Sequence, residues 1–236
     1  LLGNPDRINR QAQRLKLDLS GIEIIDMRAD KEHRRRAPYA KHLAEKLARK
    51  GYTFQEAYDK MYERNYFGMM MVERGDADAF ITGLYTKYSN TIKVATEVVG
   101  VREGFHTFGT MHVVNSQKGT YFIADTLINR HPDNNFLVDI ARLSANTVEF
   151  FNEKPVMAMI SYSNFGTDEI GSPLKVHEAV EELHANYPNL IVDGEMQVNF
   201  ALNREMRDEK YPFSKLKDKD VNTLIFPNLS SANASY

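Results

Sequence analysis

The chain has 236 residues, a formal net charge of −2 and no cysteine. This length allows one large domain or two small ones, and the lack of cysteine excludes disulfides, thiolate metal sites and a cysteine nucleophile. No apolar run approaches the roughly 18 residues of a membrane-spanning helix, and the near-neutral charge gives no general attraction to nucleic acid or membranes. We therefore expect a globular, cytoplasmic protein that binds neither nucleic acid nor membranes.

Both ends of the sequence indicate a fragment. It begins with Leu1-Leu2-Gly3, which is typical of the tail of a buried strand and lacks the basic start of a signal peptide. Residues 230–236 are typical of a loop that enters a helix. We expect a chain that was cut at both ends from a longer protein.

In the first hundred residues, short apolar runs alternate with amphipathic stretches, which indicates α/β layering. Thr53 followed by Glu56 is a capping-box pattern that opens a helix, and Gly51 and Gly75 are natural helix stops. The predicted helices cover residues 34–50 and 53–74, and the predicted strands cover residues 22–25 and 77–82.

The pattern of apolar residues changes near position 102, beyond which strand-like runs are frequent. Residues 115–119 predict a hairpin loop, and Ser172-Pro173 predicts a helix start with Ser at the N-cap. The predicted strands cover residues 108–114, 121–124, 156–160, 191–193 and 224–226, and the predicted helices begin at residues 133 and 172. We expect two α/β subdomains with a cleft between them, an incomplete one over residues 1–102 that lacks its C-terminal part and a second over residues 103–236.

Five of the predicted strands end in small polar residues. These ends lie at residues 81–83, 124–126, 161–166, 193–195 and 227–228. In α/β sheets the carboxyl ends of the strands line the ligand crevice, where hydroxyls, amides and backbone N–H groups hold a carbonyl, a phosphate or an amide. Turn and cap chemistry explains any single segment as well. Five such segments in one chain favour a ligand crevice.

Three carboxylates, Asp125, Asp193 and Glu195, stand at these strand ends. Paired carboxylates bind Mg²⁺ or act as acid and base, but an orienting or capping role is the simpler interpretation. The histidines show no metal-ligand spacing, and we interpret His177 and His184, seven residues apart on one predicted helix, as structural or surface residues. The sequence has no Gly-x-Ser-x-Gly elbow, Walker loop or dinucleotide fingerprint. We predict no metal, nicotinamide or catalytic residue within this segment.

The most basic stretch is residues 31–50, which includes Arg34-Arg35-Arg36 and Lys46. Such a stretch could meet the phosphates of a nucleotide, or it could be a solvated helix face. The sequence leaves both interpretations open.

Six segments in chain order resemble the phosphate acetyl/butyryl transferase family. They are residues 2–5 (LGNP), 75–79 (GDADA), 122–126 (FIADT), 161–166 (SYSNFG), 193–197 (DGEMQ) and 225–229 (IFPNL). The resemblance implies an α/β fold like that of isocitrate and isopropylmalate dehydrogenases, with two subdomains, an acyl-CoA cleft between them, and dimers formed through the second.

A narrower resemblance concerns residues 99–109 (VGVREGFHTFG) and 7–19, which look like the version of the family that is fused behind bacterial malic enzymes. This implies a regulatory role. In that version acetyl-CoA binds the fused domain and inhibits the malic enzyme portion, which converts malate to pyruvate with NADP or NAD and a divalent metal, Mg or Mn. The implied partners of this chain are therefore acetyl-CoA or CoA, a malic enzyme domain of the same chain, and a second copy of itself.

Departures from the family bear on catalysis. Active members carry an arginine where this chain has Lys93, which keeps the charge but loses the bidentate fork of arginine. A second family arginine aligns with Leu47, with Arg49 nearby. A Ser-Arg-Gly segment and an aspartate, which in the family polarise the acyl group and help to deprotonate the thiol, would lie beyond Tyr236. Without these charge-stabilising groups we expect binding without acyl transfer.

The strand-end pattern and the resemblance together predict the residues of the acyl-CoA cleft. They are Thr82, Gly83, Ser89, Thr91, Lys93, Asp125, Thr126, Ser161, Asn164, Asp193, Glu195 and Asn228.

Three functions remain open. The first is a regulatory acetyl-CoA-binding module of a malic enzyme, which the narrower resemblance and Lys93 favour. The second is an active phosphate acetyltransferase, which converts acetyl-CoA and phosphate to acetyl phosphate and CoA, with Lys93 neutralising the phosphate. The third is a structural dimerisation module with an empty cleft, which predicts no thermal shift with any coenzyme A ester.

Overall fold

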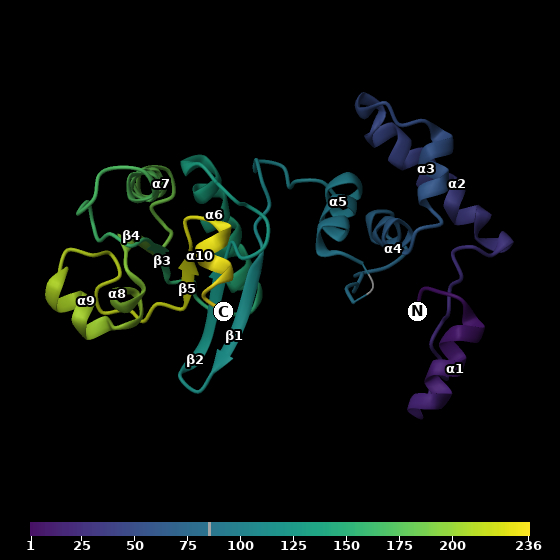
Figure 1. Ribbon diagram of the computed structural model, residues 1–236, viewed down its shortest axis with the longest axis horizontal. Helices are drawn as coiled ribbons and strands as arrows, with labels where there is room; N and C mark the ends of the chain where they lie inside the picture. Colours follow the sequence, from purple (N-terminus) through teal and green to yellow (C-terminus); the bar gives the residue numbers. More distant parts are fainter. Residues whose placement is uncertain (85) are drawn as a thin grey trace. The chain divides into compact units, whose positions relative to one another are not determined.

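The chain divides into two compact units, Leu1–Gly100 and Val101–Tyr236, here called the first and second unit (Figure 1). A computed structural model describes residues 1–84 and 86–236. No helix in this described part is long and apolar enough to cross a membrane. The subdomain roles predicted for residues 1–102 and 103–236 stay predictions.

The regular elements in the described part of the first unit are helices joined by loops. Its elements are α1 Pro5–Leu15, η1 Asp30–Glu32, α2 His33–Lys46, η2 Ala48–Lys50, α3 Phe54–Lys60, α4 Arg64–Glu73 and α5 Tyr88–Val98. The buried apolar side chains of α2, α4 and α5 form one core, in which Leu43, Phe67, Met70 and Val98 are fully buried. The predicted helix over residues 34–50 is confirmed as α2 followed by η2.

The two strands predicted in the first unit are wrong. Residues 22–25 form only an isolated parallel bridge, in which Ile25 pairs with Leu2. Residues 77–82 form no strand, and Ile81 is 96% exposed. A strand needs a neighbour to satisfy its backbone groups, and the described part of this unit contains no sheet that could receive either segment.

The single helix predicted over residues 53–74 is two helices. Its start is confirmed, because the Thr53 hydroxyl accepts from the Glu56 N–H while the Glu56 carboxylate accepts from the Thr53 N–H. The chain then turns at residues 61–63, where Met61 N–H bonds to Tyr58 O, before α4 begins.

Glu73, at the end of α4, is the acidic centre of a small ion cluster in the first unit. Its Oε1 lies 2.8 Å from Lys46 Nζ and 3.3 Å from His42 Nε2. Burial by itself raises the pKa of the Glu73 carboxyl, but the hydrogen bond and charge of Lys46, with those of His42, lower this pKa on balance below 4.5.

This arrangement predicts an acid-sensitive contribution to stability. A carboxyl whose pKa is depressed by folding stabilises the folded state above its unfolded pKa, and that contribution is lost as pH falls through the folded value. We therefore expect the free energy of unfolding to fall more steeply below pH 4.5 for the natural chain than for Glu73→Gln. Urea unfolding from about pH 6 to about pH 3 measures both slopes, and equal slopes would contradict the ion cluster.

The second unit is an α/β layer structure. Its elements are β1 Met111–Ser116, β2 Gly119–Ala124, α6 Asn134–Phe150, β3 Met157–Ile160, α7 Ser172–Asn186, β4 Val192–Met196, α8 Val198–Leu202, α9 Arg204–Lys210, β5 Thr223–Ile225 and α10 Leu229–Asn233. The strands form one mixed sheet in the order β1-β2-β5-β3-β4. β1 runs antiparallel to β2, and the other neighbours are parallel.

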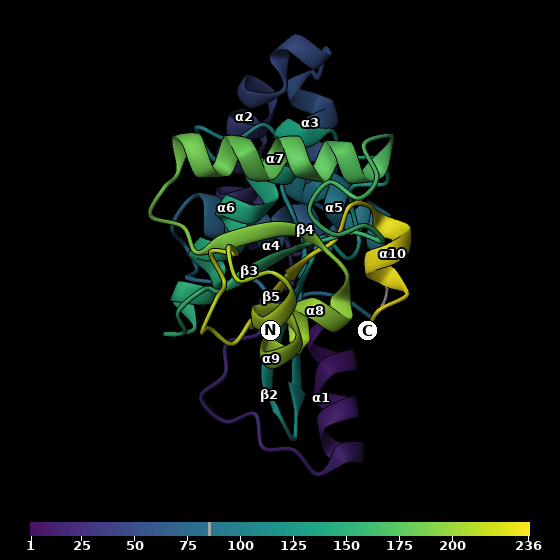
Figure 2. The ribbon, with the colours of Figure 1, turned by 90° about the vertical axis from the view of Figure 1, so that its left-hand side faces the viewer.

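Helices cover both faces of this sheet, as Figure 2 shows for α6 and α7 on one side and α8 and α9 on the other. Met157 and Met159 of β3 pack on the α6–α7 side, while Ala158 and Ile160 pack on the opposite side. Because both faces are buried, a central strand reads as a continuous apolar run rather than an alternating one, which is why residues 156–160 were predictable as a strand.

The predicted boundaries in the second unit need several corrections. β1 covers Met111–Ser116 rather than residues 108–114, and β2 begins at Gly119 rather than at residue 121. The hairpin turn comprises only residues 117–118, because Ser116 already pairs with Gly119. The N-cap of α7 is Gly171 rather than Ser172. Finally, β4 continues to Met196, so its polar residues lie within the strand. Asp193 and Glu195 tolerate the strand interior because both side chains find partners on neighbouring elements.

Candidate functional site

The carboxyl ends of four strands lie at one edge of the sheet in the second unit, because β2, β5, β3 and β4 are mutually parallel. Asp125 and Thr126 follow β2, Ser161 and Asn164 follow β3, and Asn228 follows β5. The structure therefore brings these five predicted residues to the same edge. The antiparallel β1 also begins there, since Met111 pairs with Ala124.

Asp125 is an anchor within this edge. Its side chain is 2% exposed and accepts hydrogen bonds from Thr110 N (2.8 Å), Asn129 N (2.6 Å) and Asn129 Nδ2 (2.7 Å), as well as from the Thr110 hydroxyl. These donors occupy both carboxylate oxygens. The arrangement fits the orienting role rather than acid–base chemistry, because little acceptor capacity remains for a ligand.

Thr126 links this anchor to a histidine that the sequence reasoning did not single out. The Thr126 hydroxyl is fully buried and lies 2.7 Å from Nδ1 of His112, whose ring stacks on Tyr236 with 3.7 Å between the centroids. The signal available in the sequence was the position of His112 at the start of a strand antiparallel to β2.

Asp193 holds the loop after α9 against β4. Its Oδ2 accepts from the Ser214 hydroxyl and from Lys215 N, both at 2.7 Å, and its Oδ1 lies 3.7 Å from Nε2 of His184. Only 5% of Asp193 is exposed, so its carboxylate has a structural role in fixing this loop to β4.

Glu195 is the most deeply buried carboxylate of the edge, with 0% exposed. Its Oε1 accepts from Gly166 N (2.7 Å) and from the Ser163 hydroxyl (3.2 Å), which fixes the loop after β3. Its Oε2 lies 3.3 Å from Nδ1 of His177, and neither of these two buried atoms has a hydrogen-bond partner in the described part of the chain. A protonated His177 would pair with this carboxylate.

His177 and His184 thus both face carboxylates of β4, seven residues apart on α7. We interpreted them as structural or surface residues, and the structure places them against the sheet. The spacing of seven was the available signal, because residues seven apart lie on one helix face.

The remaining predicted residues of the second unit form hydrogen bonds within or between the segments that follow the strands. The Asn164 side chain pairs with Gln197, donating to Oε1 and accepting from Gln197 N, both at 2.9 Å. The Ser161 hydroxyl accepts from Ser163 N at 3.2 Å. Asn228 is the N-cap of α10 and accepts from Ser231 N at 3.0 Å.

In the first unit, two of the predicted residues meet around Asn65, which the sequence reasoning missed. The Thr82 hydroxyl donates to Asn65 Oδ1 at 2.8 Å, and Asn65 Nδ2 donates to the Thr91 hydroxyl at 3.4 Å. Gly83 and Ser89 are exposed. Asn65 lies in an otherwise apolar helix, and a buried amide in such a place is the signal that could have identified it.

Lys93 is directed towards a buried carboxylate on its own helix. Its side chain is 60% exposed, and Nζ lies 3.8 Å from Glu97 Oε1. Glu97 is itself held by the Tyr66 hydroxyl, and burial, together with this carboxylate, raises the pKa of Tyr66. The ammonium is accessible to solvent but offers one point charge rather than a planar fork.

Part of the basic stretch over residues 31–50 has internal partners. Arg36 is buried and donates to Met27 O (2.6 Å) and Ala29 O (2.8 Å), and Arg35 pairs with Glu32. Lys46 bonds to Glu73 and to the carbonyls at the end of α5. These three cationic side chains are bound to groups of the protein itself. They are therefore not available to bind the phosphates of a nucleotide.

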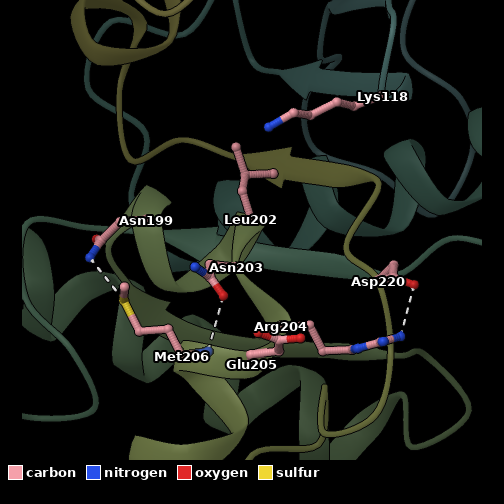
Figure 3. A pocket seen from close by; sticks show the side chains of 8 residues that line it. All are labelled: Lys118, Asn199, Leu202, Asn203, Arg204, Glu205, Met206 and Asp220. Carbon is pink, nitrogen blue, oxygen red and sulfur yellow. Dashed lines mark hydrogen bonds and ion pairs between the residues drawn. The ribbon is translucent and has the colours of Figure 1, made fainter.

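The described residues contain no cluster of three or more His, Cys, Asp and Glu side chains that could hold a metal ion. A shallow hollow of about 510 Å³ lies on the second unit, where Lys118 of the hairpin turn faces α8 and α9 (Figure 3). It is lined by Lys118, Asn199, Leu202, Asn203, Arg204, Glu205, Met206 and Asp220. Lys118 and Asp220 precede β2 and β5, so this hollow lies at the amino edge of the sheet, away from the predicted site.

The chain resembles known proteins over its whole length. A family model described as phosphate acetyl/butaryl transferase matches residues 1–236. The NADP-dependent malic enzyme of Escherichia coli (strain K12) is 34% identical over 240 residues, which cover 100% of this chain and 31% of that protein. The phosphate acetyltransferase of Bacillus subtilis (strain 168) is 31% identical over 243 residues, which cover 100% of this chain and 72% of that protein.

Solved phosphotransacetylase structures have a fold similar to that of this chain. A phosphotransacetylase from Streptococcus pyogenes has a TM-score of 0.87 and 28% sequence identity, covering 100% of this chain and 70% of that chain. The chain spans about a third of the length of the malic enzymes it matches and about seven tenths of the phosphate acetyltransferase.

Proposed function

Because the chain belongs to the phosphate acetyl/butaryl transferase family, we propose that it is a regulatory, acetyl-CoA-binding domain of a malic enzyme. In this proposal acetyl-CoA binds the domain and inhibits the conversion of malate to pyruvate by the attached malic enzyme domain. The domain itself carries out no acyl transfer. We also propose for it the two-subdomain fold related to isocitrate and isopropylmalate dehydrogenases.

Lys93 is the observation that carries the regulatory proposal. The family resemblance implies an arginine at this position in active members, and the partner of Lys93 is Glu97 of the same helix at 3.8 Å. A lysine in this position attracts an anion but cannot grip phosphate or a carbonyl with two parallel hydrogen bonds. The E. coli malic enzyme, similar to the whole of this chain, supplies the context.

The strand-end carboxylates are consistent with a binding role. The Asp125 and Asp193 oxygens are occupied by internal donors, and Glu195 is fully buried. None of them is therefore arranged as a free general base. We propose that the twelve predicted residues, which include all three of these carboxylates and Lys93, contribute to binding and to loop placement.

The other parts of the proposal concern the whole protein. The attached domain would use NADP or NAD with Mg or Mn, the assembled protein would be a homo-oligomer held through the second unit, and it would work in the cytoplasm. The malic enzyme relatives include an NADP-dependent and an NAD-dependent protein of Rhizobium meliloti, so both coenzymes occur among these malic enzymes.

An active phosphate acetyltransferase is the second candidate. It is favoured by the B. subtilis relative of that name, 72% of whose length is covered. In that case coenzyme A thiolate would attack acetyl phosphate, its sulfur would bond to the acetyl carbon, and inorganic phosphate would leave. Lys93 would then neutralise the phosphate.

One experiment separates the two candidates. Acetyl-CoA is titrated into the full-length protein while malate-dependent reduction of NADP or NAD is followed, and phosphate-dependent release of CoA is assayed on the same sample. We expect inhibition of malate oxidation without CoA release above background. Allostery requires that acetyl-CoA bind one state of the protein more tightly than another, so unchanged malate oxidation at saturating acetyl-CoA would overturn the regulatory role. CoA release would establish the acetyltransferase instead.

A further inference from the structure

Lys175 lies at the carboxyl edge of the sheet in the second unit, although no strand-end motif contains it. It belongs to the first turn of α7, the helix that follows β3. Its Nζ donates to the backbone oxygen of Pro227 at 2.9 Å. Pro227 follows β5, the central strand, and precedes Asn228. The ammonium group therefore stands beside the segment that leaves the carboxyl end of β5.

The hydrogen-bond partner of the Lys175 ammonium is uncharged. Within the described residues the ammonium forms no ion pair with a carboxylate, and a neutral carbonyl is its hydrogen-bond partner. Burial lowers the pKa of the ammonium, and Asp133 offsets this only in part. The Asp133 carboxylate caps α6 by accepting from Phe136 N at 2.8 Å, and its charge acts on Lys175 without a hydrogen bond between them.

A half-buried ammonium without a counter-ion costs free energy, because its lost hydration is not replaced by an opposite charge. The edge at which it lies is where open α/β sheets bind ligands. An anion bound at this edge would supply the missing counter-charge and use the two remaining Nζ donors.

We propose that Lys175 binds a phosphate group of a ligand at the carboxyl edge of this sheet. The tetrahedral phosphate suits a compact ammonium, which acts on it as a point charge. Where that phosphate belongs to acetyl-CoA, the inference rests on the proposed function. A phosphate from inorganic phosphate or acetyl phosphate has the same chemistry, and the experiment below separates these sources.

The test compares Lys175→Met with Lys154→Met. Both changes remove one lysine charge from the second unit, but the exposed Lys154 precedes β3 and so lies at the opposite edge. Calorimetry on the full-length protein measures binding of coenzyme A and of pantetheine, which lacks phosphate, and thermal melting is recorded in rising inorganic phosphate. Lys175→Arg keeps the charge, and melting without ligand shows that every variant is folded.

We expect Lys175→Met to weaken coenzyme A binding roughly 10- to 100-fold, the loss typical of one hydrogen bond to a charged group. Pantetheine binding should not change, Lys175→Arg should keep most of the affinity, and Lys154→Met should bind like the natural protein. If instead only the stabilisation by inorganic phosphate is lost, Lys175 serves free phosphate or acetyl phosphate.

Equal binding of coenzyme A and of phosphate by the natural protein and Lys175→Met would overturn the assignment of Lys175 while leaving the proposed function intact. If the natural protein binds no coenzyme A ester at all, the proposed function fails, and the phosphate arm alone decides about Lys175. A phosphate-dependent rise in melting temperature that disappears in Lys175→Met would then support the assignment, and the lack of any such rise in the natural protein would end it.

Discussion

Replacing Arg207 with Met is expected to lower the free energy of unfolding by about 2–6 kcal/mol, the sum for the two buried carbonyls, Ala201 O and Leu216 O, that each lose a donor. Arg207 lies on α9 and is fully buried. Its Nη2 donates to Leu216 O and Lys219 O, both at 2.7 Å, and its Nη1 to Ala201 O at 3.3 Å. One guanidinium thus joins α8, α9 and the loop that leads to β5. Met retains much of the apolar stem, so the loss reports mainly the hydrogen bonds.

Arg204→Met on the same short helix is the matched control. Arg204 pairs with Asp220 at 3.1 Å, but the two side chains are 48% and 81% exposed. Exposed pairs of this kind contribute about 0–1 kcal/mol. Urea unfolding followed by circular dichroism measures both variants. Similar midpoints for Arg204→Met and Arg207→Met would contradict the role assigned to Arg207 in holding the loop.

Gly194→Ala is expected to destabilise the second unit by about 2–6 kcal/mol, from backbone strain of about 1–3 kcal/mol and a steric clash of similar cost. The backbone of Gly194 has φ +149°, a value that residues with a side chain rarely adopt. A Cβ placed there would lie 2.5 Å from Met159 O and 3.0 Å from Met159 Cβ. Only glycine lets β4 approach β3 this closely, between Asp193 and Glu195.

Gly109→Ala controls for the added methyl group. A Cβ at Gly109 would lie 3.6 Å from Ile140 Cγ1, an ordinary contact, and the backbone there has no positive φ. We expect a change of about 1 kcal/mol or less. Thermal melting of both variants gives the comparison. Gly194 and Glu195 are neighbours in β4, and the Glu195 carboxylate holds the loop after β3. A Gly194→Ala protein that still folds should therefore also bind coenzyme A more weakly than Gly109→Ala.

Local patterns in the sequence were sufficient where the signal depends on neighbouring residues. The Thr53–Glu56 capping box and the apolar run that became β3 are confirmed, since a cap needs only a nearby partner and a strand buried on both faces needs only apolar residues. The segments at residues 22–25 and 77–82 also contain short apolar runs but form no strands. Whether an apolar run joins a sheet depends on a distant neighbour, which a local pattern does not contain.

The same distinction holds for the candidate site. Asp125, Thr126, Ser161, Asn164 and Asn228 were identified from their positions after apolar runs, and parallel pairing of β2, β3 and β5 brings them to one edge. Asn65 and Lys175 are not identified by the sequence patterns, and His177 is predicted only as a structural or surface residue. Each acquires its significance from a partner far along the chain: Thr82, Pro227 and Glu195.

The sequence by itself determined the family, the α/β character of the second unit and the strand ends that carry polar residues. These properties follow from residue order, apolar periodicity and short motifs, all of which act over a few positions. Only the tertiary structure decided which polar groups are already occupied. Asp125 and Asp193 have internal donors, whereas Lys175 has a carbonyl and no counter-ion. The physical reason is that the cost of a buried charge depends on what lies within a few ångströms of it, and chain folding alone sets those distances.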